Sequence, residues 1–125
     1  MIFTVLQVAL GGAIGASFRY LTNVSVMRLL GPGFPWGTVV CNVIGSFAMG
    51  VLVVVLANTG NNKYAPLLMT GLLGGFTTFS AFSLDAVTLF ERGALMPAAA
   101  YVLTSVVVSI IALSLGLLFA RGIVS

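Results

Sequence analysis

The chain has 125 residues, of which 60% are hydrophobic and 6% are charged, and its formal net charge is +3. This composition excludes a water-soluble globular domain and predicts an integral membrane protein. The few basic residues form no cluster, which argues against nucleic acid as a partner.

Five basic and two acidic side chains divide the sequence into apolar stretches. A membrane-spanning helix needs about 20 apolar residues, and residues 1–18, 29–62, 64–84 and 93–120 carry no charge. We therefore predict a single all-α transmembrane domain over residues 1–125, with four helices at roughly 2–22, 36–57, 65–90 and 96–120.

The first predicted helix, 2–22, occupies the place of a secretory signal. No Lys or Arg precedes its apolar run and no convincing cleavage site follows it, so we expect a retained span. Gly11, Gly12, Gly15 and Ala16 form a small face with a GxxxG spacing, which is typical of close packing between membrane helices.

The second predicted helix, 36–57, carries a small and polar stripe, in which Thr38, Asn42, Ser46 and Gly50 follow at four-residue intervals. An unpaired amide in hydrocarbon costs about 2–7 kcal/mol, so Asn42 must have a partner. That partner is either another helix or a ligand. Cys41 is most simply a small packing residue, and a single cysteine forms no internal disulfide.

The third predicted helix, 65–90, contains adjacent glycines (Gly74, Gly75) and then adjacent threonines (Thr77, Thr78). These residues weaken a helix in its middle, and lipid cannot satisfy the backbone groups that a break releases. We expect a helix broken at membrane depth, as is found where a helix lines an ion or substrate site. Carbonyl groups released by the break would suit a cation that is held in place rather than transported.

Phenylalanines recur every three residues through the same segment, at Phe76, Phe79 and Phe82. An anion could rest against phenyl edges, which carry the positive part of the ring quadrupole, while ordinary packing is the alternative. In the fourth predicted helix, 96–120, a track of hydroxyls lies within one arc and comprises Tyr101, Thr104, Ser105 and Ser109.

Hydroxyl and amide donors without an acid in mid-span favour an anion over a cation as the ligand. Taken singly, however, Ser and Thr in a membrane helix usually bond back to their own backbone. Arg19 and Asp85 fall toward the ends of predicted spans, where either could lie in an aqueous vestibule.

Basic residues are nearly balanced between the two sides of the predicted bundle. With alternating helices, Lys63 and Arg121 lie on one side, and Arg28 and Arg92 lie on the other with Arg19 close by. Because Lys/Arg asymmetry sets orientation, we expect insertion in both directions unless other cues act. Such a chain can form an antiparallel homodimer that mimics an inverted repeat.

Three motifs resemble those of the Fluc (CrcB-type) bacterial fluoride channels, and the similarity spans nearly the whole chain. They are Gly74-Gly75-Phe76-Thr77-Thr78-Phe79-Ser80-Ala81-Phe82-Ser83, Gly12-x-x-Gly15-Ala16-x-x-Arg19-Tyr20 and Trp36-Gly37-Thr38-x-x-x-Asn42-x-x-Gly45. The resemblance implies a dual-topology antiparallel homodimer with two pores, which exports fluoride passively from the cytoplasm across the bacterial inner membrane.

The resemblance also implies the site residues. A structural sodium ion would be held by the backbone carbonyls of Gly74 and Thr77, with no organic cofactor. Arg19 would lie near the anion entrance, and Asp85 stands where the family often has Glu. The expected fluoride pore comprises Asn42, Phe79, Phe82, Tyr101, Ser105 and Ser109, and we add Thr38 from the polar stripe.

Other classes of protein fit less well. A small multidrug antiporter needs an intramembrane carboxylate, which the first predicted helix lacks. A non-transporting assembly subunit would explain GxxxG packing but not the clustered polar tracks. An enzyme is not expected, because the sequence has no His, one Cys and no paired carboxylates. The expected partners are fluoride, an antiparallel copy of the chain and the lipid bilayer.

Overall fold

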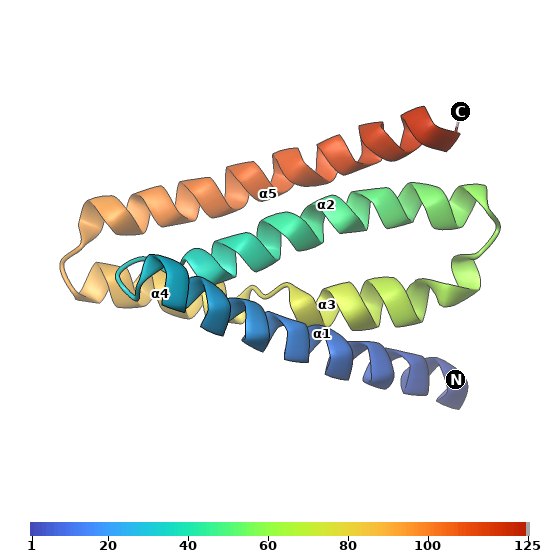
Figure 1. Cartoon of the computed structure of the whole chain (residues 1–125), viewed down its shortest axis with the longest axis horizontal. Helices are drawn as coiled ribbons and strands as arrows, with labels where there is room; N and C mark the ends of the chain where they lie inside the picture. Colours follow the sequence, from blue (N-terminus) through green and yellow to red (C-terminus); the bar gives the residue numbers. More distant parts are fainter. Residues whose placement is uncertain (125) are drawn as a thin grey trace.

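Helices and short connections make up all of residues 1–124, the part of the chain described by a computed structural model (Figure 1). Four helical stretches are long and apolar enough to cross a membrane, namely Ile2–Leu30, Trp36–Asn58, Asn62–Glu91 and Leu95–Val124. The elements in chain order are α1 (Ile2–Leu30), α2 (Trp36–Asn58), η1 (Asn62–Tyr64), η2 (Pro66–Leu73), α3 (Gly74–Phe76), α4 (Ser80–Glu91) and α5 (Leu95–Val124).

The first helix is longer than predicted. It was expected to end near residue 22, whereas α1 continues to Leu30. Residues 23–30 are more polar than a typical span, yet they contain no Gly or Pro that would stop a helix. Gly31 ends the helix with a φ of 83°, a backbone angle that favours glycine. At the other end of the chain, α5 begins one residue earlier than predicted and extends beyond residue 120.

Glycines let α1 pack directly on the backbone of η2. A Cβ at Gly11 would overlap the carbonyl oxygen of Leu67, and a Cβ at Gly15 would overlap that of Leu72. A Cβ at Gly12, by contrast, would meet nothing within 4 Å. The GxxxG pair Gly11 and Gly15 therefore brings two backbones into contact, as its spacing predicts.

Helices α2 and α5 form another extensive contact in the bundle. It depends on Gly50 of α2 and Gly116 of α5, since a Cβ at Gly50 would overlap the carbonyl oxygen of Leu113 and a Cβ at Gly116 would overlap that of Phe47. The core of buried side chains lies where α2, α4 and α5 meet and comprises Val39, Phe82, Leu89, Ala98 and Tyr101. Cys41 is also fully buried, as expected for a packing residue.

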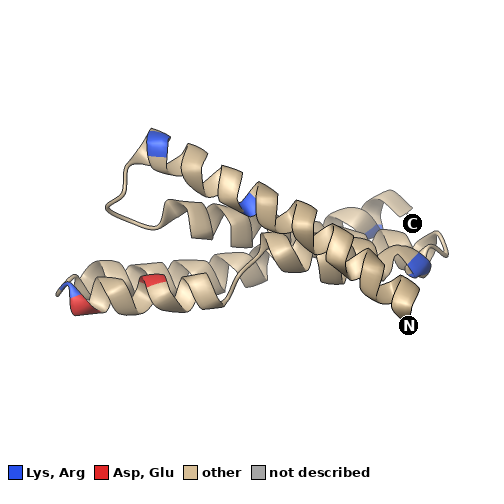
Figure 2. Ribbon diagram, turned by 90° about the horizontal axis from the view of Figure 1, so that it is seen from below, with Lys and Arg blue, Asp and Glu red and all other residues tan. Residues whose placement is uncertain are grey.

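Both termini lie at the same end of the bundle in Figure 1, because the spans alternate in direction. Figure 2 shows basic residues at both ends of the molecule, with acidic residues toward the end opposite the termini. Basic residues therefore lie at both ends of the bundle, as the sequence predicts, and Figure 2 also shows basic ribbon between the two ends.

Candidate functional site

The chain leaves helical geometry between α3 and α4. The last helical residue of α3 is Phe76, Thr77 has extended backbone angles (φ −87°, ψ 158°), and α4 begins at Ser80. The preceding segment, η2, is a π-helix, which is wider than an α-helix because each N–H bonds the carbonyl five residues back. The N–H of Gly74, for example, donates to the carbonyl of Met69. The backbone N–H and the hydroxyl of Thr77 both donate to the Leu73 carbonyl, each at 2.9 Å.

Asn42 on α2 binds the backbone of this interruption at two points. Its Nδ2 donates to the carbonyl oxygen of Thr78 at 3.0 Å, and the N–H of Thr78 donates to Asn42 Oδ1 at 2.8 Å. The partner that the sequence required for the Asn42 amide is therefore the non-helical backbone between α3 and α4. One side chain satisfies two of the backbone groups that α3 and α4 leave open.

Arg19 on α1 reaches the interruption from another side. Its Nε donates to the carbonyl oxygen of Gly75 at 3.0 Å. A cation beside the last carbonyls of a helix is favourable, because those groups carry the negative end of the helix dipole. Arg19, which was expected near a vestibule, contacts the end of α3 through this hydrogen bond.

The carbonyl oxygens of Gly74 and Thr77 are left free. Within residues 1–124, neither accepts a hydrogen bond from the backbone or from a side chain. Gly74 is also exposed in the single chain. These two carbonyls are the ones at which the family resemblance implies a sodium ion.

A hollow of about 470 Å³ adjoins the interruption. It brings together most of the expected pore residues and both expected sodium ligands. Its lining includes Asn42, Gly74, Thr77, Phe79, Phe82, Ser105 and Ser109, together with Gly45, Ser46 and Thr78.

Two serine hydroxyls beside this hollow have no hydrogen-bond partner in the described part of the chain. They are Ser105 Oγ and Ser109 Oγ, and both atoms are buried. Ser114, farther along α5, bonds back to the Ile110 carbonyl at 3.0 Å, which is the usual behaviour of a membrane serine. Ser105 and Ser109 depart from that behaviour and leave donors available beside the hollow.

The two expected pore phenylalanines differ in burial. Phe82 is 8% exposed and packs against Tyr101, with ring centroids 5.3 Å apart. Phe79 is 76% exposed, although its ring centroid lies 5.5 Å from that of Phe82. Phe76 does not line the hollow.

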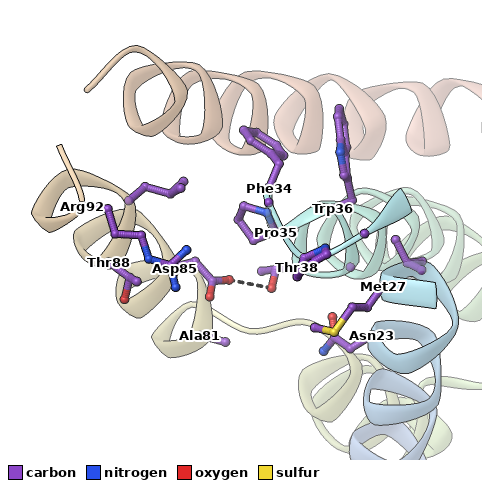
Figure 3. A pocket seen from close by; sticks show the side chains of 16 residues that line it. Asn23, Met27, Phe34, Pro35, Trp36, Thr38, Ala81, Asp85, Thr88 and Arg92 are labelled. Carbon is purple, nitrogen blue, oxygen red and sulfur yellow. Dashed lines mark hydrogen bonds between the residues drawn. The ribbon is translucent and has the colours of Figure 1, made fainter. Parts of the chain in front are cut away.

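A second hollow, of about 360 Å³, opens near the connection between α1 and α2 (Figure 3). Here Thr38 of α2 and Asp85 of α4 point toward one another, and Thr38 Oγ1 donates to Asp85 Oδ2 at 2.8 Å. Tyr101 OH donates to the same oxygen at 3.0 Å. The expected pore residues Thr38 and Tyr101 therefore meet the expected vestibule residue Asp85.

Arg92 lines the second hollow as well and was not among the predicted site residues (Figure 3). It lies seven residues after Asp85, so about two helical turns place both on one side of the segment. That spacing was the available signal in the sequence.

A family model described as "CrcB-like protein, Camphor Resistance (CrcB)" matches residues 6–117. The chain belongs to the CrcB family. A relative from Cereibacter sphaeroides is 68% identical over 122 residues, which is 98% of each chain. One from a Ruegeria species is 59% identical over 126 residues and 100% of each chain, and one from Paracoccus denitrificans is 54% identical over 120 residues and 96% of each chain.

All three CrcB relatives carry the name "Fluoride-specific ion channel FluC". This agrees with the family resemblance of the three motifs and with the expectation that the chain is not an enzyme. Together with the four apolar helical stretches, membership of the CrcB family makes the protein a multi-pass membrane protein.

Proposed function

We propose that this protein is a fluoride channel that passes fluoride out of the cytoplasm and so reduces fluoride toxicity. The observation that carries the proposal is the pair of buried, unpartnered hydroxyls of Ser105 and Ser109 beside the first hollow. Leaving a buried donor unsatisfied costs about 1–3 kcal/mol, which a bound anion would remove. The names of the CrcB relatives support fluoride as that anion.

The proposed path joins the two hollows. Ser105, Ser109, Asn42, Phe79 and Phe82 line the part beside the interruption. Hydroxyl and amide donors replace part of the hydration shell of the ion, and phenyl edges add weak positive charge without holding it tightly. The second hollow is the proposed vestibule, where Asp85 meets Thr38 and Tyr101. Arg19 contributes positive charge at the end of α3.

The proposed assembly is an antiparallel homodimer with two pores in the bacterial inner membrane. Phe79 supports it, because a pore residue that is 76% exposed in one chain needs a second surface to enclose the path. The balanced basic residues at the two ends support insertion in both orientations. The third span, Asn62–Glu91, would then be interrupted near the middle of the membrane, as in transporters built from inverted repeats.

A structural sodium ion fits the free carbonyls of Gly74 and Thr77. Unwound backbone at membrane depth coordinates Na⁺ through such oxygens in other membrane proteins. Two carbonyls from each chain of a dimer would supply oxygen ligands without any acidic side chain. The ion would hold the two interruptions together, and no organic cofactor is proposed.

Liposomes that contain the purified protein test the function. They are loaded with potassium fluoride or potassium chloride. A potassium ionophore is then added, so that potassium can leave together with the anion and no membrane potential stops the efflux. We expect fast fluoride efflux and negligible chloride efflux. Chloride efflux as fast as that of fluoride would reject the proposed selectivity, and no efflux of either ion would reject the channel.

A further inference from the structure

Two hydrogen bonds to Thr78 hold the side-chain amide of Asn42 in one orientation. Its Oδ1 accepts the N–H of Thr78 at 2.8 Å while its Nδ2 donates to the carbonyl of the same residue at 3.0 Å. Rotating the amide by half a turn would place donor against donor and acceptor against acceptor. The orientation is therefore determined, and one N–H of Nδ2 remains for any other partner.

Thr78 is the residue on which the start of α4 depends. Its hydroxyl accepts the N–H of Ala81, the second residue of α4, at 3.1 Å, while Phe79 occupies the N-cap position itself. The next residue is Phe79, and the N–H of Ser83 then donates to the Phe79 carbonyl at 2.8 Å. Fixing the peptide groups of Thr78 therefore fixes the direction in which Phe79 and Phe82 leave the interruption.

The helix that carries Asn42 passes close to the interruption. A Cβ at Gly45, three residues after Asn42, would overlap Cγ2 of Thr77. Cys41, the residue before Asn42, is fully buried, and its Sγ lies 3.9 Å from the Arg19 carbonyl oxygen. The segment of α2 that carries Asn42 is therefore packed against the interruption at Gly45 and against α1 at Cys41.

We infer that Asn42 is a positioning residue, which holds the Thr78 peptide groups so that Phe79 and Phe82 line the path. This inference rests on the proposed fluoride channel. It differs from a role in which Asn42 acts on the anion alone, because such a role would not need the backbone N–H of Thr78.

A backbone ester separates the two roles. Replacing Thr78 with its α-hydroxy acid removes the N–H that donates to Asn42 Oδ1 and leaves every side chain intact. It also turns the Thr77 carbonyl, a proposed sodium ligand, into an ester carbonyl, so sodium content is measured on the same preparation. We expect fluoride efflux to fall at least about tenfold, as it would in Asn42→Ala. Because both changes break one interaction, the ester in an Asn42→Ala background should lower efflux by less than about twofold more. Normal efflux from the ester variant, or full additivity of the two changes, would overturn the inference.

Hydrogen exchange supplies a readout that does not depend on transport. The amide of Thr78 should exchange slowly in the native chain and at least about tenfold faster in Asn42→Ala. Asn58→Ala, at the exposed end of the same helix and outside both hollows, is the matched control and should leave that exchange unchanged. Equal exchange in Asn42→Ala and native protein would overturn the inference. A native protein without fluoride efflux would reject the proposed function and still leave this measurement valid.

Discussion

The phenol of Tyr101 donates a hydrogen bond to the carboxylate of Asp85, with 3.0 Å between OH and Oδ2. Thr38 donates to the same oxygen at 2.8 Å. Two hydroxyls that were expected to meet an anion therefore meet a carboxylate. In the proposed channel, a fluoride ion that reaches this point would compete with Asp85 for the two donors.

Tyr101→Phe removes one of the two donors and keeps the ring that packs on Phe82. A hydrogen bond to a charged group contributes about 1.5–3 kcal/mol when well shielded, so this partly exposed one should contribute about 1 kcal/mol. We expect a small loss of thermal stability and a clear fall in fluoride efflux. Tyr64→Phe, with an exposed ring at the start of the third span, is the control. Equal efflux from both variants would show that the Tyr101 hydroxyl is not needed.

Gly11→Ala and Gly12→Ala are a matched pair on α1. A Cβ at residue 11 would overlap the Leu67 carbonyl, whereas one at residue 12 would meet nothing within 4 Å. We expect Gly11→Ala to cost about 1–3 kcal/mol through overpacking, and Gly12→Ala to leave stability unchanged or raise it slightly. Thermal unfolding of the two purified variants in the same detergent measures the difference. Similar unfolding temperatures would contradict the backbone contact between α1 and η2.

Phe79→Ile and Phe82→Ile separate packing from anion recognition. Phe82 is buried, so its replacement should cost about 1 kcal/mol of stability, while replacement of the exposed Phe79 should cost almost none in the single chain. An isoleucine has no positive ring edge, so fluoride efflux should fall markedly in both variants. Efflux and unfolding are measured on the same preparations. Normal efflux from both would leave the hydroxyls of Ser105 and Ser109 as the path.

The spans could be predicted from sequence because charged residues rarely lie within hydrocarbon. The end of α1 could not, because residues 23–30 are polar enough to resemble a loop and only Gly31 stops the helix. Periodicity places Thr38 and Tyr101 on faces of separate helices. Periodicity does not give the rotation of one helix relative to another, so it could not predict that Thr38 and Tyr101 both bond to Asp85. Gly116 was missed for the same reason, since its meaning depends on the helix that crosses it.

Reporter fusions at the C-terminus test the orientation of the chain in cells. Lys63 and Arg121 lie on one side of the predicted bundle and Arg28 and Arg92 on the other, so basic charge gives little preference for either orientation. We therefore expect activity both from a reporter that works only in the cytoplasm and from one that works only outside it. Adding two lysines after Arg121 should favour one orientation and lower the yield of functional channels, because antiparallel partners become scarce. Activity on one side only in the unmodified chain would reject dual topology.

Gly74→Ala tests whether a second chain approaches the interruption. Within one chain a Cβ at residue 74 fits, since the nearest heavy atom, the Met69 carbonyl oxygen, lies at 3.6 Å. A loss of the dimer or of its sodium in Gly74→Ala would therefore come from contacts with a second chain. If two copies meet at their Gly74 and Thr77 carbonyls, the added methyl groups should weaken the dimer and lower its sodium content while the helices remain folded. Gly122→Ala, where a Cβ meets nothing within 4 Å, is the control. Molar mass in detergent, metal content and circular dichroism measure the three effects, and a Gly74→Ala dimer with native sodium and efflux would place the contact between copies elsewhere.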